Sequence, residues 1–224
     1  MKTISIAVLS TTLLVLAGCS DDKSTGSDLP PGDATYKVTF TSTWSAQTHP
    51  DGFPGNPHFS RLVGGTHNDM VSFWNNGGLA TQGIQNMAEL GATAALESEV
   101  QDAIDAGTAE HVLVGGGINP SPGNVSLNFS LTTEFPRVTL TSMIAPSPDW
   151  FVGVSGLSLW QNDDWVDSLT VDLYLYDAGS DDGTDYTSAN AASNPHVPIM
   201  PITGYPAKVN DDVPPVGTFT FTRM

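Results

Sequence analysis

The sequence predicts a mainly β protein, an antiparallel β-sandwich of about eight strands with one or two helices inserted between strands. Two observations carry this prediction. Apolar and polar residues alternate in several short segments, as where Tyr36, Val38 and Phe40 are separated by polar residues, and such alternation is typical of half-buried strands. Turn-forming residues separate these segments, with 22 Gly and 16 Pro in the 224-residue chain, so the strands are expected to be short.

The alternating segments give the expected strands in chain order. The clearest patterns lie at 35–44, 124–131, 137–144, 168–176 and 216–224, and weaker ones at 69–74, 110–116 and 150–160. Residues 91–107 differ, because their apolar residues recur at three- and four-residue spacing. That spacing predicts a helix of about four turns that stops near Gly107. An earlier start, around 82–87, is left open.

The first residues predict export and a lipid anchor. Lys2 precedes an apolar run over 4–16, which is too short for a membrane-spanning helix and suits a secretory signal. The run ends in LAGC at 16–19, which resembles a bacterial lipobox, in which the cysteine is lipidated and becomes the mature N-terminus. The alternative is an ordinary signal with a chance cysteine. We predict a lipoprotein signal peptide at 1–18 and lipidation at Cys19.

Beyond the signal, the composition predicts a tether and one domain. Residues 19–34 are almost without apolar side chains and are expected to form a flexible tether, so the domain is placed at 35–224. Ser20 follows the lipidated residue, which by analogy with bacterial sorting favours the outer membrane, with the domain facing the periplasm or the cell surface. Cys19 is the only cysteine, so the domain has no disulfide, and its stability must come from its core and from any bound metal.

The charge of the chain bears on its partners. Against 24 acidic residues there are 7 basic ones, a net charge of −17. Nucleic acid is therefore not an expected partner, because binding it requires clustered Lys and Arg. Anionic lipid needs a bridging cation, and divalent cations suit such a surface. The alternative interpretation is that the negative charge serves only to keep the protein soluble.

No catalytic motif is recognised in the sequence. The segment GVSGL at 153–157 has Leu157 where a nucleophile elbow has its second glycine, and Ser155 falls in an expected strand. The glycines at 115–117 lack a following Lys-Ser/Thr pair and are expected to form a turn. The five histidines show no zinc-binding spacing. The chain is therefore not expected to be an enzyme.

Several blocks in a fixed order resemble the spondin domain family. They are WSAQTHPDGFPGNPHFSRLVGGTHN at 44–68, LATQGIQNMAELG at 79–91, PSPDWFVGVSGLSLW at 146–160, LYLYDAGSDDGTDYTSAN at 173–190 and ITGYP at 202–206. The resemblance covers about residues 36–206 and implies a β-sandwich with a calcium site at one edge, and an extracellular adhesion or ligand-binding role. Animal members carry cysteines near the stretch matching 157–165, where this chain has none.

The resemblance implies that Asp149, Asp177 and Asp181 bind Ca²⁺. Calcium takes six to eight oxygen ligands, several of them carboxylates, and the glycines that follow Asp177 and Asp181 allow the loop to curl and present carbonyls. The spacing is not that of an EF-hand. The alternative is a solvated acidic loop, and the roles of Asp182 and Asp185 are left open.

The preferred interpretation is a calcium-binding spondin-domain lipoprotein of the cell envelope, an adhesion or ligand-binding module whose ligand the sequence does not name. The alternative is a carbohydrate-directed enzyme acting on envelope or extracellular polymers, with a cleft lined by some of the tryptophans Trp74, Trp150, Trp160 and Trp165. Tryptophans in a sandwich are more often core residues.

Overall fold

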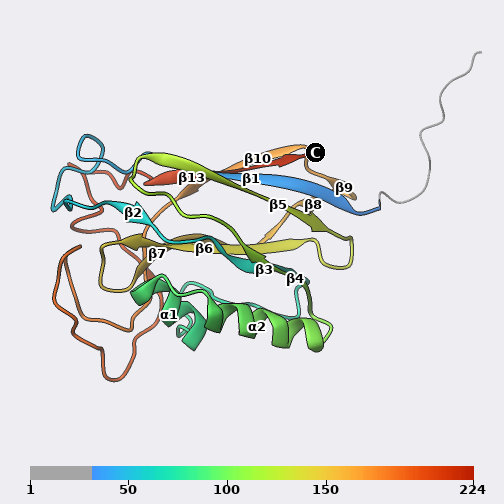
Figure 1. Cartoon of the computed structure of the whole chain (residues 1–224), viewed down its shortest axis with the longest axis horizontal. Helices are drawn as coiled ribbons and strands as arrows, with labels where there is room; N and C mark the ends of the chain where they lie inside the picture. Colours follow the sequence, from blue (N-terminus) through green and yellow to red (C-terminus); the bar gives the residue numbers. More distant parts are fainter. Residues whose placement is uncertain (1–31) are drawn as a thin grey trace, which may run out of the picture. The chain divides into compact units, whose positions relative to one another are not determined.

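The computed structural model describes residues 32–224, which belong to one compact unit. The predicted signal peptide, Cys19 and the tether up to residue 31 lie outside the described residues. Two antiparallel sheets pack face to face, and two helices cover the outer face of one of them, so the described part has three layers (Figure 1). The predicted mainly β sandwich with inserted helices is confirmed.

The first sheet has four strands in the order β10-β13-β1-β5. Its strands are β1 (Ala34–Ser42), β5 (Gly123–Leu131), β10 (Ser168–Leu173) and β13 (Gly217–Arg223). All three pairings are antiparallel. The alternation predicted for β1 is present, since Tyr36, Val38 and Phe40 are completely buried while Lys37 is exposed.

The second sheet follows the order β12-β11-β7-β6-β3-β4, with β2 paired to β6. Its strands are β2 (His58–Phe59), β3 (Val63–His67), β4 (Ala109–Val114), β6 (Arg137–Ala145), β7 (Trp150–Ser158), β11 (Tyr176–Asp177) and β12 (Met200–Pro201). A separate hairpin pairs β8 (Trp160–Gln161) with β9 (Asp164–Trp165). Because β7 and β11 are neighbours, this sheet joins two of the predicted metal-binding segments.

Two helices pack on the outer face of the second sheet (Figure 1). These are α1 (Gln82–Leu90) and α2 (Ala94–Asp105). The single helix predicted over 91–107 therefore starts later, and the earlier start left open around 82–87 is a separate helix. Gly91 divides them: it takes a left-handed φ of 64°, and its N–H donates to the carbonyls of Asn86 and Met87. In residues 32–224 no helix is both long and apolar enough to span a bilayer.

The two interfaces between the layers give two apolar clusters. One lies between the sheets and includes Tyr36, Phe40, Trp44, Trp150 and Phe219. The other lies between the second sheet and the helices and includes Ile84, Met87, Leu96, Val100 and Phe151. Neighbouring residues of β7, Trp150 and Phe151, face opposite clusters, as expected for a strand in the middle layer.

Two strand predictions are wrong. Residues 69–74 form turns and irregular chain instead of a strand, and Phe73 and Trp74 are both buried in the helix-side cluster. The strand predicted over 168–176 ends at Leu173, because the chain then crosses from the first sheet to the second and resumes as β11 at Tyr176. That crossing places Asp177 beside β7.

Candidate metal centre

Strand pairing brings the segments of Asp149 and Asp177 together. Asp149 directly precedes β7, and β11 pairs antiparallel with β7 so that Asp177 lies opposite Trp150. The pairing continues one step further, because the Ala178 N–H donates to the Asp149 backbone carbonyl at 3.1 Å. The loop after β11 then carries Asp181 back toward Asp149.

The Asp149 side chain is buried, and its two oxygens have different surroundings. Oδ2 accepts hydrogen bonds from the Ser180 N–H at 2.7 Å, the Asp181 N–H at 3.0 Å and the Ser180 hydroxyl at 3.2 Å. Oδ1 has no hydrogen-bond partner among the described residues. The pKa of Asp149 is raised to about 6, first by burial and then by the nearby Asp177 carboxylate, while the hydrogen bonds to Oδ2 oppose the shift.

Asp177 is half-buried, and one of its oxygens is hydrogen-bonded. Its Oδ1 accepts the Gly179 N–H at 2.8 Å, a short-range bond that turns the chain just after β11. Burial raises the pKa of Asp177 above its ordinary value, and the Asp181 and Asp182 carboxylates add to the shift. The negative charges of Asp149 and Asp177 therefore destabilise each other.

Asp181 is buried and holds the loop in shape. Its Oδ1 accepts the Gly183 N–H at 2.8 Å, and its Oδ2 accepts the Ala191 N–H at 2.7 Å. An ionised carboxylate has about four lone-pair sites, so each oxygen keeps acceptor capacity beyond these bonds. Asp182 and Asp185, whose roles the sequence leaves open, have other hydrogen-bond partners. Asp182 accepts a hydrogen bond from the Ser193 hydroxyl, and Asp185 accepts one from the Tyr205 hydroxyl.

In the described part of the chain, no salt bridge brings a positive charge to these three carboxylates. The salt bridges within residues 32–224 are those of His111, Lys208 and Arg223, and none of them reaches Asp149, Asp177 or Asp181. In the same residues no three His, Cys, Asp or Glu side chains are grouped as a ready-made metal site. A buried oxygen without a hydrogen-bond partner costs folding free energy. Asp149 Oδ1 is therefore suited to bind a cation whose remaining ligands are backbone carbonyls and water.

The remaining candidate residues have structural contacts. Ser155 lies in β7, as expected, and its hydroxyl donates to the Trp74 carbonyl. Of the four tryptophans considered for a sugar cleft, Trp74, Trp150 and Trp165 are at most 5% exposed and Trp160 is half-buried. Ser180 is not predicted from the sequence as a member of this site, yet its N–H and its hydroxyl both donate to Asp149.

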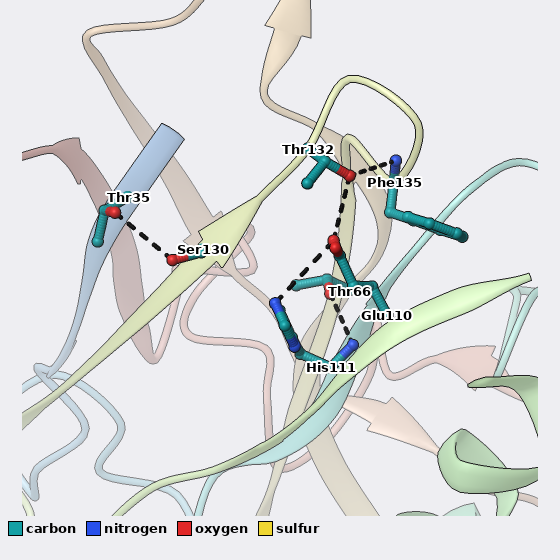
Figure 2. A network of polar contacts seen from close by, with 7 residues as sticks. All are labelled: Thr35, Thr66, Glu110, His111, Ser130, Thr132 and Phe135. Atoms are coloured by element: carbon teal, nitrogen blue, oxygen red, sulfur yellow. Dashed lines mark hydrogen bonds and ion pairs between the residues drawn. The ribbon is translucent and has the colours of Figure 1, made fainter. Parts of the chain in front are cut away.

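A second polar network joins β4 to the connection between β5 and β6 (Figure 2). The Thr132 hydroxyl donates to Glu110 at 3.1 Å and accepts the Phe135 N–H, while His111 lies 4.0 Å from the Glu110 carboxylate. The His111 N–H donates to the Thr66 hydroxyl. Through these contacts Glu110 and His111 hold the β5–β6 connection against β4 and β3, which is a structural role.

Comparison with known proteins identifies the domain type. The family model Spondin_N matches residues 34–212. Spondin-1 of Gallus gallus is 35% identical over 190 residues, which is 81% of this chain and 23% of that protein. Spondin-2 of Homo sapiens is 32% identical over 195 residues, which is 85% of this chain and 57% of that protein. The chain thus matches only part of each relative, and by the family match over most of its length it belongs to the Spondin_N family.

Proposed function

We propose that this chain is a calcium-stabilised adhesion or ligand-binding module, held at the outer membrane by a lipid on Cys19. The observation that carries the calcium part is the buried Asp149 Oδ1, which has no hydrogen-bond partner in the described residues. Asp177 adds a second carboxylate whose pKa is raised by burial and by neighbouring charge. Both observations favour a bound cation, and oxygen ligands favour Ca²⁺.

Asp149 and Asp177 would supply direct ligands to this ion, and Asp181 would join them through its remaining lone pairs. The ion would supply positive charge that offsets the repulsion among these carboxylates. Calorimetric titration of the full chain with CaCl₂ should show one site, with weaker binding of MgCl₂, because Mg²⁺ requires a tighter octahedral shell. If the titration shows no heat of binding at millimolar calcium, the loop is a solvated acidic surface and the proposed calcium site is wrong.

The adhesion part of the proposal is supported by membership of the Spondin_N family. Ligands should therefore be recovered by the lipidated chain from envelope or matrix extracts in the presence of calcium. A matched recovery with the chelator EGTA, and a second one with Asp177→Asn, separates calcium-dependent ligands from background. Equal recovery under all three conditions would contradict a role of calcium in ligand binding.

Substitution of the predicted lipidation site should release the protein from the membrane. With Cys19→Ala, the chain has no thiol to acylate, so it should appear uncleaved or soluble and should not incorporate labelled palmitate. Three acyl chains anchor almost permanently, whereas one anchors marginally, so the difference in membrane fractionation should be nearly complete. Ser20→Ala is the matched control and should remain lipidated. Palmitate labelling of Cys19→Ala would show that the anchor lies elsewhere.

The acidic chain should not bind nucleic acid. The net charge is −17, and binding to phosphates depends on clustered cationic side chains. Filter binding of the full chain to duplex DNA and to single-stranded RNA should therefore show no retention at about 150 mM salt. A salt-dependent affinity in the micromolar range would reveal a basic surface that residues 32–224 do not show.

A further inference from the structure

An open groove lies beside β7, and residues of β10 from the other sheet also line it. It has a volume of about 380 Å³ and is lined from β7 by Gly153, Val154, Ser155 and Leu157. Asp172 of β10 and Tyr174 of the crossing segment are also part of its wall. We call this hollow the edge groove. None of its wall residues is Asp149, Asp177 or Asp181, so it is distinct from the metal centre.

Both faces of β7 contribute to the edge groove. Val154 packs in the cluster between the sheets, whereas the Ser155 hydroxyl bonds to Trp74, which belongs to the cluster under the helices. Successive side chains of a strand point to opposite faces. A hollow that touches both faces must therefore pass around the edge of the strand, so the outer edge of β7 faces the edge groove.

That edge is unpaired along most of its length in the part of the chain that the structure describes. On one side β7 pairs with β6, and on the other side β11 covers only Trp150 and Phe151. The reason is the crossing at 174–175, since the chain reaches the second sheet only at Tyr176. No other strand pairing within residues 32–224 involves β7.

The backbone direction at this edge follows from one hydrogen bond. The Ala178 N–H donates to the Asp149 carbonyl, so the polar backbone groups of residue 149 point toward β11. In an antiparallel ladder such outward-pointing residues alternate. The backbone groups of Phe151 and Gly153 therefore point the same way.

The β6–β7 register shifts just after Val154, so Ser155 needs separate evidence. The N–H of Gly156 donates to the Thr139 hydroxyl of β6, and in a planar trans peptide the preceding C=O, that of Ser155, points the opposite way, away from β6. Phe151 bonds with β11, which leaves the N–H and C=O of Gly153 and the C=O of Ser155 directed into the edge groove.

We propose that the edge groove binds an extended basic peptide segment, which adds to β7 as a strand next to β11. The free N–H and C=O groups, two residues apart, match the repeat of an added strand, and β11 already uses the same edge in this way. A basic segment is favoured because Asp172 is exposed and forms no salt bridge with the described residues, in a chain of net charge −17. This inference rests on the proposed role as a ligand-binding module, and it names the ligand class.

Selection from a phage-displayed library of random linear octapeptides tests the proposal. The full chain in detergent, with calcium present, should enrich peptides that contain β-branched residues and Lys or Arg. For synthetic copies, N-methylation of alternate backbone amides should abolish binding in one register and leave it nearly unchanged in the other, because only every second N–H faces β7. If N-methylation weakens binding in neither register, side chains alone hold the peptide. That result would overturn strand addition.

Two charge-reversal variants locate the binding site. Asp172→Lys should weaken peptide binding at least tenfold, whereas Asp167→Lys, with the same charge change just before β10 and outside the groove wall, should leave it within twofold. Equal effects of both variants would assign the affinity to net charge and overturn the site. Binding of cellohexaose without any enriched peptide would also overturn it, in favour of a sugar site. A calcium-dependent melting shift in that case would leave the proposed metal centre standing.

Discussion

Replacing Gly179 with alanine should lower the free energy of unfolding by about 2–5 kcal/mol. Gly179 has a left-handed φ of +76°, and an added Cβ would collide with the Val197 backbone carbonyl. The left-handed conformation costs an alanine about 1–2 kcal/mol, and forced overpacking costs about 1–3 kcal/mol. Val197 has little freedom to move away, because its own N–H donates to the Gly179 carbonyl at 2.9 Å. Urea denaturation followed by circular dichroism measures the difference.

The effect should extend to the proposed metal centre. The Gly179 N–H donates to Asp177 Oδ1, so a displaced backbone at 179 moves a proposed ligand and should weaken the response to calcium. Gly204→Ala is the matched control, because an added Cβ there meets no atom within 4 Å and its φ is not left-handed. We expect the control to change stability by less than about 0.5 kcal/mol. Equal stability of the two variants would contradict the assigned clash.

Local pattern was sufficient for β1, whose alternation reports one buried face and one exposed face. For β6 the pattern predicted the strand correctly but not its burial on both faces, since residues 138–145 are all buried. The helices cover the second face of β6, and its polar residues are satisfied by distant groups: the Thr141 hydroxyl donates to the Val63 carbonyl and the Ser142 hydroxyl to the Ser60 carbonyl. Such partners lie about 80 positions away, at 78 and 82 residues, so a local window does not contain them.

The limit of local pattern also explains why a strand was wrongly predicted at 69–74. Val71 and Phe73 alternate with polar residues as in a strand, but Phe73 and Trp74 are adjacent and both buried. Consecutive buried residues do not fit a strand with one solvent-exposed face. Here an irregular segment turns both side chains into the cluster under the helices, and a periodicity of two does not detect this arrangement.

The candidate site was predicted only in part, for a related reason. Motif order identified Asp149, Asp177 and Asp181, because the carboxylates are part of the sequence pattern. The difference between the two oxygens of Asp149 depends on which N–H groups the loop directs at it, and those come from Ser180 and Asp181, more than 30 positions later, at separations of 31 and 32 residues. The unpaired edge of β7 was not predicted either, because it results from where the chain changes sheets at 174–175.

Removing one charge from the proposed metal centre should have opposite consequences with and without calcium. A ligand that binds only the folded state at 100 times its dissociation constant stabilises it by roughly 2.7 kcal/mol, which for a domain of this size raises the melting temperature by about 5–10 °C. Asp177→Asn keeps an oxygen that can accept the Gly179 N–H but removes a negative charge. The variant should lose most of the calcium-induced rise in differential scanning calorimetry.

In EGTA the same variant should be as stable as the parent protein or more stable. The reason is that Asp177 raises the pKa of the buried Asp149, and Asp181 and Asp182 raise that of Asp177, so an uncharged residue 177 relieves repulsion among carboxylates. Asp69→Asn is the matched control, since Asp69 is exposed and forms no salt bridge within residues 32–224; it should behave as the parent in both conditions. If Asp177→Asn instead lowers the melting temperature equally with calcium and with EGTA, the negative charge of residue 177 stabilises the turn after β11 as a charged acceptor of the Gly179 N–H, independently of calcium. That result would remove Asp177 from the proposed calcium site.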